Sequence, residues 1–176
     1  MLEDTIHLKE SKLLLEALLE KPEGFDEYHA SEIAKILKEV YNQEGLEAFL
    51  TYTRAIPEEY LGEVLLELPE NIKDEALNEL SVSKLVDIVD ELDSDDAVDL
   101  MQDIEDIDSD KEREVLSNLD KEDIEDIELL KKYEEDEAGA LMQTELFSAN
   151  LDEMIGEAVE RPVSYTHLTL PTICSV

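Results

Sequence analysis

Residues 56–130 read IPEEYLGEVLLELPENIKDEALNELSVSKLVDIVDELDSDDAVDLMQDIEDIDSDKEREVLSNLDKEDIEDIELL, and one short pattern returns along this stretch. Each unit has an aliphatic residue, a turn or capping residue, and then mostly polar positions before the next aliphatic residue. The units begin at Ile56-Pro57, Leu68-Pro69, Leu80-Ser81, Leu92-Asp93, Ile107-Asp108 and Leu119-Asp120. The first four starts are twelve residues apart, and a three-residue slip precedes the fifth. A fixed period of this kind indicates an internal repeat.

Each unit is long enough for one short helix. Proline at the first helical position gives up an N–H that has no partner there, and Ser or Asp caps the same end. Inside a unit the apolar residues lie three and four apart, as in Leu85, Ile88, Val89 and Leu92. One helix cannot bury such a stripe alone, so neighbouring helices must stack in order, as in solenoid proteins. The sequence therefore predicts an all-α array; a plain helical bundle is the alternative, but a bundle needs no fixed period.

Three more helices are predicted before the repeats. The first covers residues 7–20 and is ended by Pro22 and Gly24, which interrupt helices. The second follows Ser31, and the third covers about residues 44–55. Apolar residues recur at helical spacing in all three.

The charge balance is extreme, with 14 Lys and Arg against 49 Asp and Glu, a net charge of −35. Nucleic acid and anionic membranes are polyanions, so both are poor partners. Because 43% of the residues are hydrophobic and periodic, the charge does not indicate disorder. Like charges three or four apart on a helix lie ~5–6 Å apart and repel across a Debye length of ~8 Å. Divalent cations are the natural counterions for such a coat.

The chain shows no membrane or secretion signal. No run approaches the ~18 apolar residues of a membrane helix, and the first residues, MLED, lack the basic and apolar parts of a signal peptide. The sequence therefore predicts a cytosolic chain. Its one cysteine, Cys174, offers no disulfide and no cysteine metal site.

The acidic run with the most defined spacing lies in residues 92–103. Asp95, Asp99 and Asp103 are four apart and share one helix face, with Asp96 beside them. Oxygen ligands suit a hard cation, and Mg²⁺ is commonly held by one or two carboxylates while it keeps several waters. The pattern predicts a weak, tunable Mg²⁺ site; the alternative is a solvated acidic surface.

Other chemistries fit poorly. A calcium loop starting at Asp106 would place Lys111 where glycine is required and Ser117 where glutamate is required. His7 and His29 have no neighbouring ligand or nucleophile set and fit surface or helix-start positions. There is no glycine-rich phosphate loop, so we do not predict an enzyme.

The character of the chain changes after the repeats. Residues 131–137 are highly charged and mark a domain boundary, and residues 138–162 read as the start of another domain that breaks off. Residues 163–176 contain no charge and resemble translated sequencing-adapter DNA, with a real edge strand as the alternative. We leave this segment out of the functional argument.

Three motifs carry a resemblance to a known family: HASEIAKIL at 29–37, LDSDDAVDL at 92–100 and YEEDEAGALMQT at 133–144. Together with the repeats they resemble the cytosolic part of MgtE-type magnesium transporters, over roughly residues 25–160. The resemblance implies a right-handed superhelix of short stacked helices, armadillo-like or solenoid-like, over residues 1–137. It implies the truncated start of an α/β CBS domain over 138–162.

The family resemblance also implies a function. In such transporters Mg²⁺ binds between the superhelical domain and the CBS domains and favours a closed pore, on the cytoplasmic side of the membrane. The partners are the CBS and transmembrane domains of the full-length protein, which is a homodimer. By motif position Asp95 and Asp99 match metal ligands, and Gly139 matches a backbone carbonyl ligand. The chain lacks the pore and alone cannot transport an ion.

Two other readings stay open. The short repeats also resemble the armadillo-like helices of flagellar motor switch proteins, which would make the chain a protein-interaction scaffold. That reading does not account for residues 133–144. An acidic mimic of nucleic acid is the third reading, and only the charge supports it.

Overall fold

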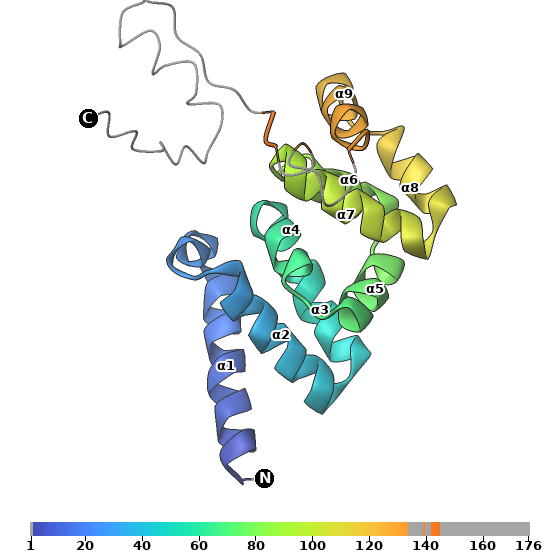
Figure 1. Ribbon diagram of the computed structural model, residues 1–176. Helices are drawn as coiled ribbons and strands as arrows, with labels where there is room; N and C mark the ends of the chain where they lie inside the picture. The colour runs from blue at the N-terminus through green and yellow to red at the C-terminus, as the bar shows by residue number, and fades with distance from the viewer. Residues whose placement is uncertain (1, 134–138, 140–141, 145–176) are drawn as a thin grey trace, which may run out of the picture. The chain divides into compact units, whose positions relative to one another are not determined.

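The computed structural model describes residues 2–133, 139 and 142–144 (Figure 1). In this part of the chain every regular element is helical and no strand occurs, so the all-α prediction is confirmed. The described residues belong to one compact unit, which covers residues 1–144. Apart from Gly139 and residues 142–144, the predicted CBS start and the uncharged tail lie outside the described residues.

The elements follow one another with short connections. They are, in chain order, α1 (Leu2–Glu20), the 3-10 helix η1 (Pro22–Glu27), α2 (Ala30–Glu44), α3 (Leu46–Ala55), α4 (Glu58–Leu66), α5 (Glu70–Glu79), α6 (Val82–Val89), α7 (Ser94–Ile107), α8 (Ser109–Leu116) and α9 (Lys121–Leu130). None of these helices is long and apolar enough to cross a membrane.

The repeat units each form one helix, as predicted. The second residue of every unit is the N-cap of α4, α5, α6, α7, α8 or α9. The three-residue slip lengthens α7 to 14 residues, whereas the other five helices have 8–10. The repeat therefore absorbs the slip inside a helix and keeps its helix starts.

The prolines differ from the prediction by one position. Pro57 and Pro69 are N-caps and not first helical residues, with ψ of 148° and 137°. The fixed φ of proline suits either position, but an N-cap has extended ψ, and its carbonyl already accepts helical bonds. The Pro57 carbonyl accepts from the amides of Tyr60 and Leu61 at 3.2 and 3.1 Å.

Side-chain capping is only partly as predicted. The Ser81 hydroxyl accepts from the Lys84 amide at 3.3 Å, and the Asp108 carboxylate accepts from two amides of α8. Asp93 and Asp120 make no such bond at their helix starts. The Asp93 carboxylate instead accepts a bond from a residue far along the chain, as described below.

The helices before the repeats also begin at other residues than predicted. Helix α1 begins at Leu2 and not at residue 7. Helix α2 begins at Ala30, because His29 is its N-cap and the His29 amide donates to the Glu32 carboxylate at 3.2 Å. Helix α3 begins after Gly45, whose φ of 84° favours glycine.

The helices stack in two rows. Contacts join α2 to α4, α4 to α6 and α6 to α8 in one row, and α3 to α5, α5 to α7 and α7 to α9 in the other. The rows meet along a buried core to which each helix contributes its apolar stripe; Leu85, Ile88 and Val89 of α6 are at most 2% exposed. The helices thus stack in chain order, as neighbouring repeats were expected to do. The right-handed, solenoid-like superhelix stays a prediction.

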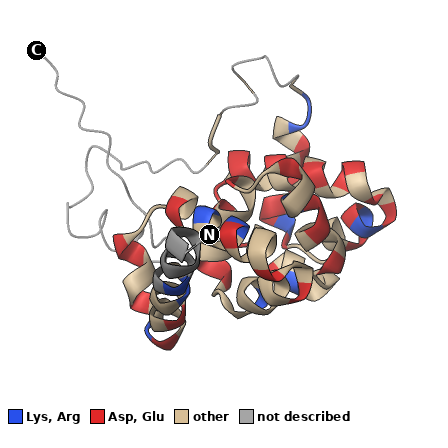
Figure 2. Cartoon of the chain, turned by 90° about the horizontal axis from the view of Figure 1, so that it is seen from below, with Lys and Arg blue, Asp and Glu red and all other residues tan. Residues whose placement is uncertain are grey.

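Several of the few cationic side chains pair with residues of a neighbouring helix. Acidic residues cover the helices seen in Figure 2, whereas basic residues occur at few places. Lys12 of α1 pairs with Glu44 at 2.8 Å, and Lys84 of α6 pairs with Glu58. These ion pairs join neighbouring helices in a chain that has few positive charges.

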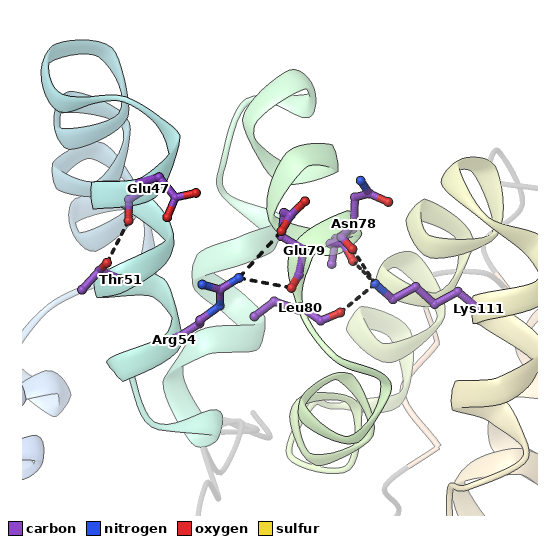
Figure 3. Close-up of polar contacts among 8 residues, drawn as sticks. Glu47, Thr51, Arg54, Asn78, Glu79, Leu80 and Lys111 are labelled. Carbon is purple, nitrogen blue, oxygen red and sulfur yellow. Dashed lines mark hydrogen bonds and ion pairs between the residues drawn. The ribbon is translucent and has the colours of Figure 1, made fainter.

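The C-terminal end of α5 shows this use of cations most clearly (Figure 3). Lys111 of α8 donates to the carbonyls of Leu77, Asn78 and Leu80 at 2.6, 2.9 and 2.7 Å. Arg54 of α3 donates to the Glu79 carbonyl at 3.3 Å. These carbonyls have no helical partner and lie at the negative end of the helix dipole, so both cations stabilise them.

Candidate metal centre

The N-terminal part of α7 carries the predicted acidic site. Its helical period turns apolar and small residues inward, and Ser94, Ala97 and Val98 are 5%, 4% and 3% exposed. The intervening aspartates are less buried: Asp99 is exposed, and Asp95 and Asp96 are half-buried. The positive end of the helix dipole favours carboxylates in this first turn.

Asp95 and Asp99 lie one turn apart on α7. Asp95 is half-buried and Asp99 is exposed. The Oδ1 atom of Asp95 is shut off from solvent and has no hydrogen-bond partner among the described residues. A buried carboxylate oxygen without a donor is costly, because nothing replaces the water it has lost. A cation is the kind of partner that would compensate it.

The pKa of Asp96 is raised by burial and by the negative charges around it. Burial raises the pKa of its carboxyl group to about 6, and the charges of Asp95, Asp99, Glu63 and Asp93 add to the rise. Glu63 comes from α4, which contacts α7. Sequence reasoning missed it, since no spacing rule relates two residues of different repeats.

Helix α4 approaches the start of α7 closely because of a glycine. A Cβ atom at Gly62 would lie 2.5 Å from Cδ2 and 2.7 Å from Cγ of Leu92. Only glycine leaves room for the Leu92 side chain at this point. The contact brings the Glu63 helix beside the acidic turn.

Asp103 is in a different situation from the other predicted ligands. Its carboxylate pairs with the Lys73 ammonium group at 2.5 Å, and the two side chains are 26% and 13% exposed. This pair joins α5 to α7. Lys73 therefore already supplies the positive charge that Asp103 was expected to take from a metal.

The segment after α9 returns to the start of α7. The Gln143 side-chain amide donates to Asp93 Oδ2 at 3.1 Å, and the Thr144 backbone amide donates to Ser94 Oγ at 2.9 Å. Thr144 Oγ1 is a second buried oxygen without a hydrogen-bond partner among the described residues. The motif at 133–144 and the motif at 92–100 are thus in contact across 50 residues of sequence.

Gly139, the predicted carbonyl ligand, belongs to the same segment. A Cβ atom here would lie 2.4 Å from Cδ1 of Tyr133, so the ring lies directly against the glycine. The Gly139 carbonyl accepts from the Met142 amide at 3.4 Å. That bond is long, and a carbonyl oxygen has a second lone pair for another partner.

The possible metal-ligating atoms at the start of α7 suit magnesium better than a soft metal. They are all oxygen atoms, and the part of the chain that the structure describes has no group of three or more metal-ligating side chains able to hold an ion. Mg²⁺ needs only one or two carboxylates, since it keeps several waters. The buried oxygen of Asp95 and the neighbouring Asp99 fit that requirement.

Fold and site together define a helical-repeat domain with an acidic patch at the start of α7, where residues 142–144 contact this helix. A family model described as the MgtE intracellular N domain matches residues 28–136. The chain belongs to this family, and the resemblance found in the motifs is confirmed. The description of this family as an intracellular domain agrees with the predicted intracellular location.

Two solved structures have the same fold. One is a crystal structure of the cytosolic domain of the Mg²⁺ channel MgtE in complex with ATP, with a TM-score of 0.60, 24% identity, and coverage of 81% of this chain and 61% of that one. The other is a crystal structure of the soluble part of a magnesium transporter, with a TM-score of 0.64, 22% identity, and coverage of 90% and 63%. This chain therefore spans less than two thirds of either structure. No curated protein matches it.

Proposed function

We propose that this chain is the Mg²⁺-sensing regulatory part of a magnesium transporter, on the cytoplasmic side of the membrane. The observation that carries the proposal is the buried, unpartnered oxygen of Asp95, the residue that follows the Ser94 contact with Thr144. The family assignment supports it, because the motif 92–100 lies inside the matched residues. In this role the chain binds an ion as a signal and catalyses nothing.

The proposed site uses Asp95, Asp99 and the Gly139 carbonyl. Asp103, paired with Lys73, adds only negative potential. A CBS domain beginning at residue 138 supplies further ligands, and the transmembrane domains and a second copy of the chain complete the transporter. The helical array would then be the right-handed superhelix of the family.

The driving force is relief of repulsion. Two carboxylates ~6 Å apart repel by roughly 0.7–3 kcal/mol as the effective dielectric constant falls from 80 to 20. Mg²⁺ removes this cost only in the arrangement where both domains face the ion. It therefore favours the closed transporter to the extent that it binds that arrangement better than the open one.

The experiment is a thermal-unfolding titration of the chain with MgCl₂ against NaCl of equal ionic strength. At ten times the dissociation constant Mg²⁺ adds about 1.4 kcal/mol, a rise of about 3–6 °C in Tm. Asp95→Ala with Asp99→Ala should abolish this rise, and should raise the Tm without Mg²⁺ because repulsion falls.

The matched control is Asp87→Ala with Asp106→Ala, which removes the same charge at two exposed positions. It should keep the Mg²⁺ response. Equal changes in Tm with Mg²⁺ and with NaCl would show that the acidic residues form a solvated surface and no ion site. In that case, specific retention of a basic protein partner would favour the interaction scaffold.

A further inference from the structure

The contact between residues 142–144 and α7 is built from both side chain and backbone. Ser94 is 5% exposed, so its hydroxyl accepts the Thr144 amide proton in a site that is partly closed to water. The Asp93 carboxylate accepts from Gln143, although a helix-start aspartate ordinarily accepts from its own helix. Both residues of the α7 start are thus used to hold a segment 50 residues away.

The contact lies next to the candidate ion site. Asp95, the candidate ligand, directly follows Ser94 in the first turn of α7. Residues up to Thr144 group with the helical unit, and the following residues form a separate unit. The contact therefore lies at the C-terminal end of the helical unit.

We propose that Gln143 and Thr144 form a latch on α7, held by Asp93 and Ser94, which fixes residues 142–144 beside the candidate ion site. Asp93 and Ser94 are then positioning residues and bind no metal. The latch itself needs no ion. Its part in sensing rests on the proposed function, in which the ion binds at Asp95, the residue that follows Ser94.

The latch is tested by hydrogen exchange of the whole chain, with and without MgCl₂. The Thr144 amide should be protected in the unmodified chain, and Ser94→Ala should speed its exchange roughly 3- to 10-fold, the usual range for one lost hydrogen bond. Amides in the middle of α7 should not change. Ser117→Ala, which removes an exposed serine hydroxyl from the end of α8, is the matched control.

Gln143→Ala is a second test of the latch, and it changes no residue of the helices. It should also speed exchange at Thr144, and it should weaken the Tm response to Mg²⁺ while Asp95 and Asp99 remain. Exchange at Thr144 that is unprotected in the unmodified chain, or unchanged in both variants, would overturn the latch.

The two proposals fail separately. A normal Mg²⁺ response with no protection at Thr144 would overturn the latch and leave the sensing role standing. Protection at Thr144 that both variants abolish, with no Mg²⁺ response in any form of the chain, would support the latch as an attachment and overturn the sensing role.

Discussion

The ammonium group of Lys111 lies 2.6 Å from the backbone carbonyl oxygen of Leu77, although the two residues are 34 positions apart. Lys111 also reaches two further carbonyls at the end of α5. Burial lowers the pKa of this lysine, against the effect of Asp108 and Glu79, which raise it. The contact joins α8 to α5 across the two rows of helices.

Replacing Lys111 should therefore weaken the array more than replacing a surface lysine. We expect Lys111→Met to lower the free energy of unfolding by about 1–3 kcal/mol, because three carbonyls lose a charged donor. Urea unfolding measures the change. Lys121→Met is the control, since the Lys121–Glu125 pair is exposed and should contribute less than about 0.5 kcal/mol. Equal losses in the two variants would contradict a capping role for Lys111.

Gly62→Ala tests the close approach of α4 to Leu92. The added methyl group would overlap Leu92 Cγ at 2.7 Å, and overpacking costs about 1–3 kcal/mol, offset by about 1 kcal/mol of helix propensity. We expect a net loss of about 0–2 kcal/mol in urea unfolding. The same substitution in a Leu92→Ala background should be neutral or stabilising. If the background made no difference, the contact would not be the reason for the glycine.

Lys131 joins three helices through carboxylates. Its ammonium group lies 2.8 Å from Glu112 and 2.9 Å from Glu105, and the Glu112 side chain is only 8% exposed. Lys131→Met leaves Glu112 buried without a counterion, and we expect a loss of about 2–4 kcal/mol at pH 7. Glu112→Leu added to this variant should recover a large part of the loss. Failure to recover would show that the lysine stem, and not the charge, stabilises the joint.

Stability should depend on pH through Asp123. Burial, followed by a hydrogen bond to the Asp90 carboxylate, raises its pKa to about 6. The folded chain therefore holds a proton that the unfolded chain, with a pKa near 3.8, has released. Stability from this group is complete below about pH 4 and is lost as pH rises through 6. Asp96, with a pKa raised to about 6, acts in the same direction.

The measurement is thermal unfolding between pH 4.5 and 7.5. We expect Asp123→Asn to flatten the fall in Tm across this range and to raise the Tm at pH 7.5, since asparagine stays neutral and can still donate to Asp90. Glu58, whose pKa is lowered chiefly by its bond to Lys84, loses its contribution only at lower pH. Asp126→Asn on the same helix is the control. A pH profile unchanged by Asp123→Asn would contradict the assignment.

The sequence alone determined the helical character and the start of each repeat helix. The N-cap residue at the start of each repeat unit acts on its own local backbone, so its effect can be predicted without knowing the fold. The same holds for the shared helix face of Asp95 and Asp99, which follows from helical period. The proline positions were wrong by one residue because N-cap and first helical position accept the same φ.

Only the tertiary structure decided which distant groups meet at the acidic site. The charge of Glu63 acts on Asp96, and Lys73 forms an ion pair with Asp103. Gln143 donates a hydrogen bond to Asp93. The partners in these pairs are 30 to 50 residues apart in the sequence. Local propensity carries no information about such pairs, because they depend on how one row of helices packs on the other. The repeat fixed each helix separately, and the packing of the rows brought their charges together.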